Sequence, residues 1–170
     1  GLKKNSLFGN KVKQVQDSVN SFCEKIKTGK KNQSTEEFMI IARIESLILN
    51  KSHKDAISRA KSYIKAGADG IMIHSKDKHP KELIKFCKIY NQLNNRKPLV
   101  IVPSSFSHFK EKQIEKLGAN IIIYANHLLR SAYPTMKKTA ETILKYQRSK
   151  EAEKNMLTIN EILNLIPGTK

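Results

Sequence analysis

Residues 38–45, with the sequence FMIIARIE, are the stretch that decides the fold. The four apolar residues at 38–41, followed by Ala42, predict a strand that is buried on both faces, as in a parallel sheet covered by helices. The run ends in Arg43 and Glu45, whose spacing places both side chains on one face of a strand. In parallel α/β folds, ligands bind at the carboxyl ends of strands, where an arginine suits carboxylate or phosphoryl oxygens. A structural ion pair between the two side chains is the alternative interpretation.

Three further apolar runs have the same layout: residues 69–75 (DGIMIHS), 98–105 (PLVIVPSS) and 120–127 (NIIIYANH). Each ends in polar residues, which include His74 after the first run and Asn126 after the last. We therefore predict four parallel strands near residues 38–44, 70–74, 99–103 and 120–125, with helices outside. This is the pattern of a (β/α) TIM-type barrel, and a doubly wound open sheet is the alternative.

Helical periodicity and the glycines that follow it predict the remaining elements. The predicted helices cover residues 12–28, 55–66, 80–93, 107–117 and 127–150. A tail helix is predicted with Thr158 as its N-cap and Glu161 at position N3. Within residues 127–150, Pro134 predicts either a kink or a helix that begins near it. Four strand–helix units are half of an eight-stranded barrel, which typically has about 250 residues. We expect residues 1–150 to form this carboxyl-terminal half barrel and residues 151–170 to form a helical tail.

The formal charge of +17 comes mostly from lysine, since the chain has only five arginines. The lysines are spread over nearly every predicted helix and loop, and tryptophan is absent. Nucleic-acid readers more often gather basic groups and interleave aromatic residues, so solvated helix faces are the favoured interpretation. Neither a signal peptide nor an apolar run of membrane-spanning length is present. Cys23 and Cys87 lack the spacing of a metal site or a disulfide, which predicts reduced thiols in a cytoplasmic protein with no membrane association.

Several short motifs, taken in order, resemble the carboxyl-terminal half of the phosphoenolpyruvate mutase family, in the isocitrate lyase superfamily. They are KKNSL at residues 3–7, IARIE at 41–45, AGADGI at 66–71, HSK at 74–76, VP at 102–103 and YANHLLR at 124–130. Each motif alone is weak, but their order and spacing together are specific. The resemblance runs from Lys3 to about Lys150.

The resemblance implies an isomerase that interconverts phosphoenolpyruvate and phosphonopyruvate, forms C–P bonds for phosphonate biosynthesis and needs Mg²⁺. It implies a gating loop that contains Lys3, Asn5 and Ser6, all of which would contact the substrate. Superfamily lyases carry a cysteine in that loop, whereas the first cysteine here is Cys23, so the lyase reaction is disfavoured. Phosphonopyruvate hydrolase stays an alternative, because it differs in this loop mainly by a threonine at the position of Asn5.

The chemistry of the residues agrees with this activity. Moving a phosphoryl group from oxygen to carbon requires charge stabilisation of a metaphosphate-like species and of an enolate. Arg43 and His74, at neighbouring strand ends, are suited to bind phosphoryl oxygens, and Asn5 is suited to contact the moving group, so Asn5, Arg43 and His74 are the candidate catalytic residues. Glu45 would orient metal-bound water instead of binding Mg²⁺ directly. For His74, a structural role at a strand end is the alternative.

The family's metal-binding aspartates and its phosphoryl-binding turn lie upstream of the matched span, so the resemblance covers half of an active site. We therefore expect a fragment, or one half of a split barrel, whose partners are the missing amino-terminal half, the small-molecule substrate and further copies in a homo-oligomer. A remnant without catalytic activity, or a basic α/β module that binds a partner, is the alternative of another class.

Overall fold

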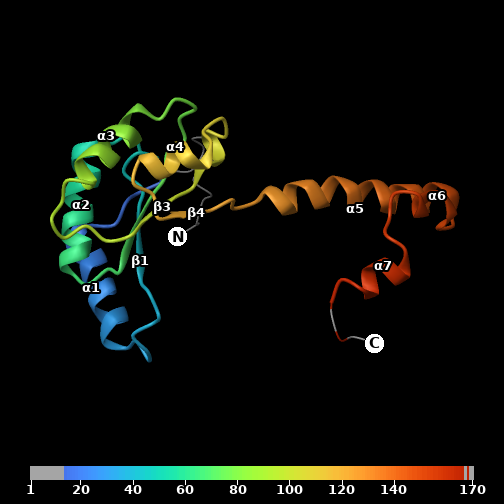
Figure 1. The fold of residues 1–170 in the computed structure, drawn as a ribbon, viewed down its shortest axis with the longest axis horizontal. Helices are drawn as coiled ribbons and strands as arrows, with labels where there is room; N and C mark the ends of the chain where they lie inside the picture. Colours follow the sequence, from blue (N-terminus) through green and yellow to red (C-terminus); the bar gives the residue numbers. More distant parts are fainter. Residues whose placement is uncertain (1–13, 167, 169–170) are drawn as a thin grey trace. The chain divides into compact units, whose positions relative to one another are not determined.

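The computed structural model describes residues 14–166 and 168. Contacts between residues divide the chain into two compact units, Gly1–Ala125 and Asn126–Lys170. In Figure 1 the first unit contains the sheet with helices α1 to α4, and the second contains helices α5 to α7. The change from sheet to helices along the chain therefore falls at residue 126. The division into a half barrel of residues 1–150 and a tail of residues 151–170 stays a prediction.

Four parallel strands form one sheet in the first unit, in the order β1-β2-β3-β4. Their bounds are β1 Ile41–Ile44, β2 Gly70–Ile73, β3 Leu99–Ile101 and β4 Ile121–Ile122. Each strand pairs with the one before it in the chain, without the reversal of strand order that defines a doubly wound sheet. The predicted parallel α/β architecture is confirmed, and the strand order favours the barrel over the open sheet.

The first strand is shorter than predicted. Phe38 and Met39 are 63% and 46% exposed, so the prediction that the apolar run is buried from its first residue is wrong. Pairing begins only where Ile41 meets Gly70, because the neighbouring strand begins there. Just before that point, Asp69 accepts a hydrogen bond from the Ile40 backbone N–H (2.8 Å), and its own N–H donates to the Ile40 carbonyl (2.9 Å).

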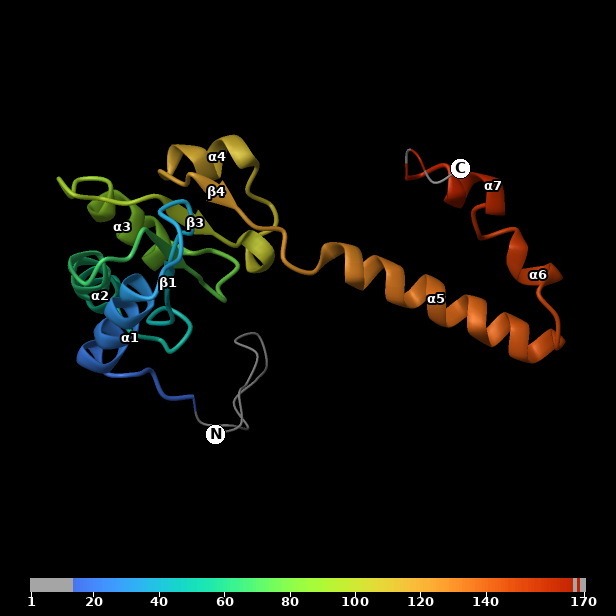
Figure 2. The ribbon, with the colours of Figure 1, turned by 90° about the horizontal axis from the view of Figure 1, so that it is seen from below.

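Helices α1 to α4 follow one another along one side of the sheet (Figure 2). Their bounds are α1 Val19–Lys31, α2 His53–Lys65, α3 Lys81–Tyr90 and α4 Glu111–Lys116. Alternate strand residues form the buried core with these helices: Ala42, Ile44, Ile71, Ile73, Leu99 and Ile101. Because side chains alternate along a strand, the residues between them lie on the opposite face, away from helices α1 to α4.

The first helix begins seven residues later than predicted, at Val19 instead of residue 12. Ser18 is its N-cap, and its hydroxyl accepts a hydrogen bond from the Ser21 backbone N–H (3.1 Å). This bond satisfies one of the backbone donors that have no acceptor within the first turn of a helix, so the helix can begin here. The helix also continues through Gly29 to Lys31, so the prediction that Gly29 ends it is wrong. In contrast, Gly67 and Gly118, with φ angles of +105° and +94°, follow α2 and α4 as expected of helix-ending glycines.

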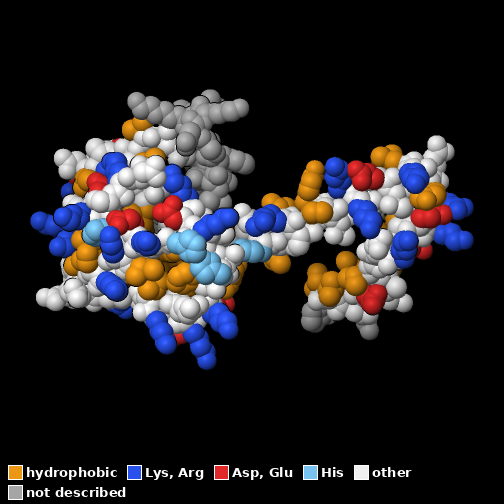
Figure 3. All heavy atoms as spheres, turned by 90° about the horizontal axis from the view of Figure 1, so that it is seen from above, with side chains coloured by type: hydrophobic (Ala, Val, Ile, Leu, Met, Phe, Trp, Pro, Cys, Tyr) orange, Lys and Arg blue, Asp and Glu red, His pale blue; other side chains and the backbone are white. Residues whose placement is uncertain are grey.

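The lysine and arginine side chains are distributed as the sequence suggested. Figure 3 shows them scattered over the visible face of both units, among acidic and apolar side chains, with no single basic patch. Many of the acidic groups pair with them, as Asp69 does with Lys30 (2.9 Å) and Glu82 with Lys85 (2.9 Å). None of the described helices is both long and apolar enough to span a membrane.

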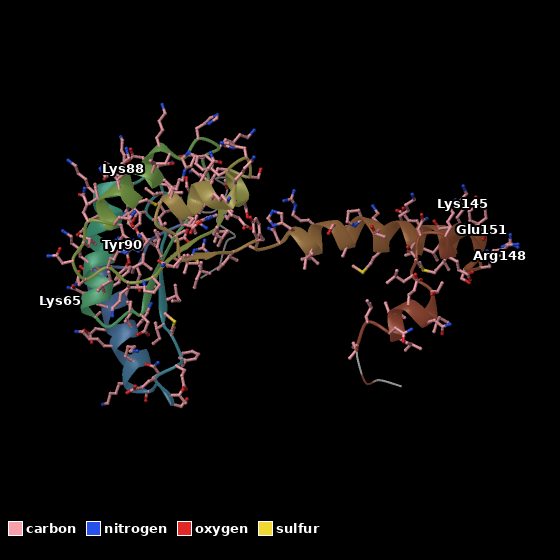
Figure 4. The ribbon with its side chains drawn as sticks, viewed as in Figure 1. Lys65, Lys88, Tyr90, Lys145, Arg148 and Glu151 are labelled. Atoms are coloured by element: carbon pink, nitrogen blue, oxygen red, sulfur yellow. The ribbon has the colours of Figure 1, made fainter. Side chains whose placement is uncertain are left out.

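The second unit consists of α5 His127–Tyr146, α6 Lys150–Glu153 and α7 Ile159–Leu163. Helix α5 begins at His127 and continues through Pro134, so it does not begin near the proline. Gln147, with φ of 52°, ends it in the left-handed conformation, and Arg148 Nε then bonds to Glu151 Oε1 of α6 (3.0 Å; Figure 4). The predicted cap of the tail helix is confirmed, because Thr158 and Glu161 form a capping box.

Candidate functional site

Arg43 lies within β1 and Glu45 directly follows this strand. Ala42 and Ile44 belong to the core beneath the helices, so Arg43 and Glu45 lie on the opposite face. Arg43 Nε and Glu45 Oε1 form an ion pair, and their side chains are 45% and 30% exposed. The prediction that both project from one face is confirmed. The ion pair of the alternative interpretation is therefore present, and it also fixes the guanidinium at the strand end.

His74 directly follows β2, the neighbour of β1, and is only 5% exposed. Burial lowers the pKa of His74 and the charge of Arg43 lowers it further, whereas Glu45 and a hydrogen bond to the Val102 backbone raise it. The ring atom Nδ1 is buried and has no hydrogen-bond partner among the described residues. We infer that Nε2 donates to the Val102 carbonyl, which leaves the lone pair of Nδ1 directed at whatever binds beside it.

Three of the predicted site residues therefore come together at the carboxyl ends of β1 and β2. The charges of Arg43 and Glu45 both act on His74, which places the three groups within electrostatic range of one another. The other three predicted residues, Lys3, Asn5 and Ser6, lie outside the described residues. Asn126, which was expected at the fourth strand end, belongs to the second unit, where it precedes α5.

A buried hydrogen-bond network that the sequence analysis missed fixes the end of β1. Ser46 is fully buried, donates to Asp55 Oδ2 of α2 (2.6 Å) and accepts from Gln16 Nε2 (3.2 Å). Arg59 of α2, 6% exposed, continues the network through Asp55 (3.3 Å), the Asp17 carbonyl (2.9 Å) and the Tyr63 hydroxyl (3.0 Å). The network joins the segment before α1, the end of β1 and helix α2. The spacing of Asp55, Arg59 and Tyr63 by four residues places them on one helix face, but the sequence does not show their contacts with Gln16, Asp17 and Ser46, which lie on other elements.

A second residue that was not predicted lies at the end of β3. Residues Pro103–Ser105 form a short 3₁₀ helix directly after the strand. Within it, the hydroxyl of Ser104 is buried and has no hydrogen-bond partner among the described residues. The sequence shows only that two serines follow the strand, because the exposure of each depends on how the turn is built.

The described residues do not provide a magnesium site. Among residues 14–166 and 168, no group of three or more His, Cys, Asp or Glu side chains is arranged to hold a metal ion. Glu45 is engaged in the ion pair with Arg43. That Glu45 orients metal-bound water and that the ligands of Mg²⁺ lie outside this chain stay predictions.

Comparison with known proteins gives the family. A sequence profile described as phosphoenolpyruvate phosphomutase matches residues 3–144, which is most of the chain. The chain belongs to the phosphoenolpyruvate phosphomutase family. A phosphoenolpyruvate phosphomutase of Tetrahymena pyriformis is 33% identical over 163 residues, which are 96% of this chain and 53% of that protein. The chain therefore spans about half the length of this relative.

Solved structures of the mutase family and of a related hydrolase share the fold. The crystal structure of a phosphoenolpyruvate phosphomutase from Streptomyces platensis subsp. rosaceus matches with a TM-score of 0.85 and 33% identity, over 96% of this chain and 55% of that one. A phosphonopyruvate hydrolase in complex with oxalate and Mg²⁺ matches with a TM-score of 0.78 and 31% identity, over 88% of this chain and 52% of that one. The predicted half of a TIM-type barrel is thus confirmed.

Proposed function

We propose that this chain is the carboxyl-terminal half of a phosphoenolpyruvate mutase, an isomerase that interconverts phosphoenolpyruvate and phosphonopyruvate. The observation that carries the proposal is the grouping of Arg43, Glu45 and His74 at the strand ends of a half barrel of this family. A binding module without catalytic function has no need for a fixed guanidinium and a buried, unpartnered imidazole nitrogen at this edge. The first half of the barrel would come from the same polypeptide or from a separate chain.

In this proposal Arg43 binds the phosphoryl oxygens throughout the transfer. The ion pair with Glu45 holds the guanidinium in one orientation, so binding loses less side-chain entropy. His74 would support the same group from β2 with Nδ1 protonated, because a neutral ring whose Nε2 donates to Val102 can only accept at Nδ1. Its burial places it where a hydrogen bond is worth more than in water. Both side chains act on charge that spreads over the phosphoryl oxygens in the transition state.

The loop that contains Lys3, Asn5 and Ser6 would close over the substrate. Asn5 would then contact the transferring group, Ser6 would bind beside it, and Lys3 would add positive potential. Exclusion of water matters here, because water would trap a metaphosphate-like species and convert the transfer into a hydrolysis. The matched profile includes this loop, since it begins at residue 3.

The residues that bind Mg²⁺ would come from the other half of the barrel. The hydrolase structure with oxalate and Mg²⁺ supports a metal in the complete protein. In the part of the chain that the structure describes, Glu45 is the carboxylate that acts on His74, and it is paired with Arg43. We assign to this half the binding of the phosphoryl group and to the other half the binding of the metal.

The test is an assay with phosphonopyruvate, followed by ³¹P NMR, on the barrel-complete protein, by which we mean this chain together with the amino-terminal half of the barrel. The proposed isomerase converts the phosphonate signal into that of phosphoenolpyruvate. Release of inorganic phosphate instead would identify the alternative, a phosphonopyruvate hydrolase. The 31% identity to the phosphonopyruvate hydrolase of Variovorax sp. is the observation that supports this alternative. A folded protein that changes neither compound would overturn the proposal. Assembly as a homo-oligomer and location in the cytoplasm stay predictions.

A further inference from the structure

The hydroxyl of Ser104 carries an inference beyond the residues assigned so far. A buried hydroxyl without a partner is costly, since it has lost its hydrogen bonds to water and gained none in return. Native structures contain few such groups, and each calls for a physical reason. Within the described part of the first unit, the strand ends of β2 and β3 each carry one, at His74 Nδ1 and Ser104 Oγ.

The two unpartnered atoms belong to adjoining segments. β2 pairs with β3 in register, so that Ile73 lies beside Ile101. His74 then contacts the backbone of Val102. Ser104 follows Val102 by two residues, which can span at most about 7 Å. The Ser104 backbone therefore lies within one short turn of the group that His74 touches.

We propose that Ser104 is a further substrate-binding residue, whose hydroxyl donates a hydrogen bond to an oxygen of the anionic substrate beside His74. The proposal rests on the proposed function for the identity of the substrate. A hydroxyl suits this role because it can donate to an oxyanion whatever the pH, whereas Nδ1 of His74 can donate only when the ring is protonated. Ser105, in the same 3₁₀ turn, does not share this buried, unpartnered state, so the assignment is to one serine of the pair.

The effect on stability separates this role from a structural one. A serine kept for folding is hydrogen-bonded, and its replacement by alanine lowers the melting temperature. For Ser104→Ala we expect a melting temperature that is unchanged or higher, because the substitution removes an unsatisfied buried hydroxyl. Ser104→Ala should, in contrast, bind the substrate more weakly than the wild type. The loss of one hydrogen bond to a charged group weakens binding roughly ten- to hundredfold.

The experiment compares the wild type, Ser104→Ala and the matched control Ser105→Ala in the barrel-complete protein with Mg²⁺. The substrate KM should rise at least tenfold in Ser104→Ala, with a smaller change in kcat, and stay within about twofold of the wild type in Ser105→Ala. Equal KM values in Ser104→Ala and the wild type, or a lowered melting temperature, would overturn the inference.

Calorimetric titration with oxalate and with inorganic phosphate separates this inference from the proposed function, because it does not depend on turnover. Weaker oxalate binding in Ser104→Ala alone assigns the hydroxyl to a carboxylate, and weaker phosphate binding assigns it to the phosphoryl group. If the wild type converts neither phosphoenolpyruvate nor phosphonopyruvate, the proposed reaction is wrong. Weaker binding of oxalate or of phosphate in Ser104→Ala still supports Ser104 as a binding residue in that case. Binding that is the same in all three proteins, or absent from all three, overturns it.

Discussion

Arg43 is the residue at which the two interpretations of the strand end differ most. If it binds the phosphoryl group, Arg43→Lys should lower the turnover of the barrel-complete protein about a hundredfold, because an ammonium cannot reproduce the planar fork of a guanidinium. This corresponds to roughly 3 kcal/mol of transition-state stabilisation. If Arg43 only pairs with Glu45, the same variant should lose stability and keep its turnover per folded molecule. Kinetics and thermal unfolding on one preparation decide between them, and Arg96→Lys, an exposed site in the loop before β3, is the matched control.

His74 should make the stability of the sheet unit depend on pH. Its pKa in the folded chain is lowered from the usual 6.5, mainly by burial, so the unfolded chain binds the proton more tightly. The stabilisation is therefore complete well above pH 6.5 and is lost as the pH falls from there toward the lower folded pKa. We expect the free energy of unfolding in urea to fall less between pH 7.5 and pH 5 in His74→Asn than in the wild type. His127→Asn, at an exposed histidine of the second unit, should follow the wild type. Parallel curves for His74→Asn and the wild type would contradict the prediction.

At the scale of elements, the fixed end of β1 depends on the network centred on Arg59. Replacing Arg59 by leucine removes the donor to the part-buried Asp17 carbonyl and to the buried Tyr63 hydroxyl, so that both oxygens lose this hydrogen bond. The free energy of unfolding should fall by about 3 kcal/mol, measured by urea denaturation. Arg96→Leu, at an exposed arginine, should change it by less than about 0.5 kcal/mol. If Arg59→Leu lowered the free energy of unfolding as little as Arg96→Leu does, the network would contribute no stability.

The sequence predicted the type and order of the elements better than their ends. Four apolar runs followed by polar residues were sufficient for a parallel sheet, and the spacing of Arg43 and Glu45 was sufficient to place them on one face. The ends of elements depend on where a neighbour stops, as at Ile41, or on one capping side chain, as at Ser18. Apolar periodicity carries neither kind of information.

Pairings between distant residues were also beyond the sequence. Arg59 and Asp17 are separated by a helix and a strand, so their contact exists only once the sheet has formed. The burial of the Ser104 hydroxyl without a partner among the described residues depends on the geometry of one 3₁₀ turn. Both features involve polar atoms within the folded unit, whose hydrogen bonds are set by three-dimensional packing.

At the scale of the whole molecule, helix α5 carries a row of apolar side chains that its own unit does not bury. No side chain of α5 is buried, although Leu129, Met136 and Ile143 recur every seven residues and therefore lie on one face of the helix. They are 67%, 58% and 38% exposed. Within the sheet unit, helices α1 to α4 cover only one face of the sheet. The amino-terminal half of the barrel would cover the sheet, whereas the apolar face of α5 is suited to a second copy of this chain.

The apolar face of α5 therefore predicts self-association that a single charge can reverse. The chain should sediment as a dimer or larger species, with a weight-average mass that rises with concentration. Met136→Glu places a carboxylate in the centre of this face and should shift the distribution toward the monomer, because an unpaired charge is costly at an apolar contact. Lys138→Glu is the matched control, since two residues along a helix correspond to a rotation of about 200° and Lys138 lies on the opposite side. If Met136→Glu associates as strongly as the wild type, the contact lies on another surface, such as the uncovered sheet. A wild-type chain that stays monomeric at all concentrations would contradict the prediction itself.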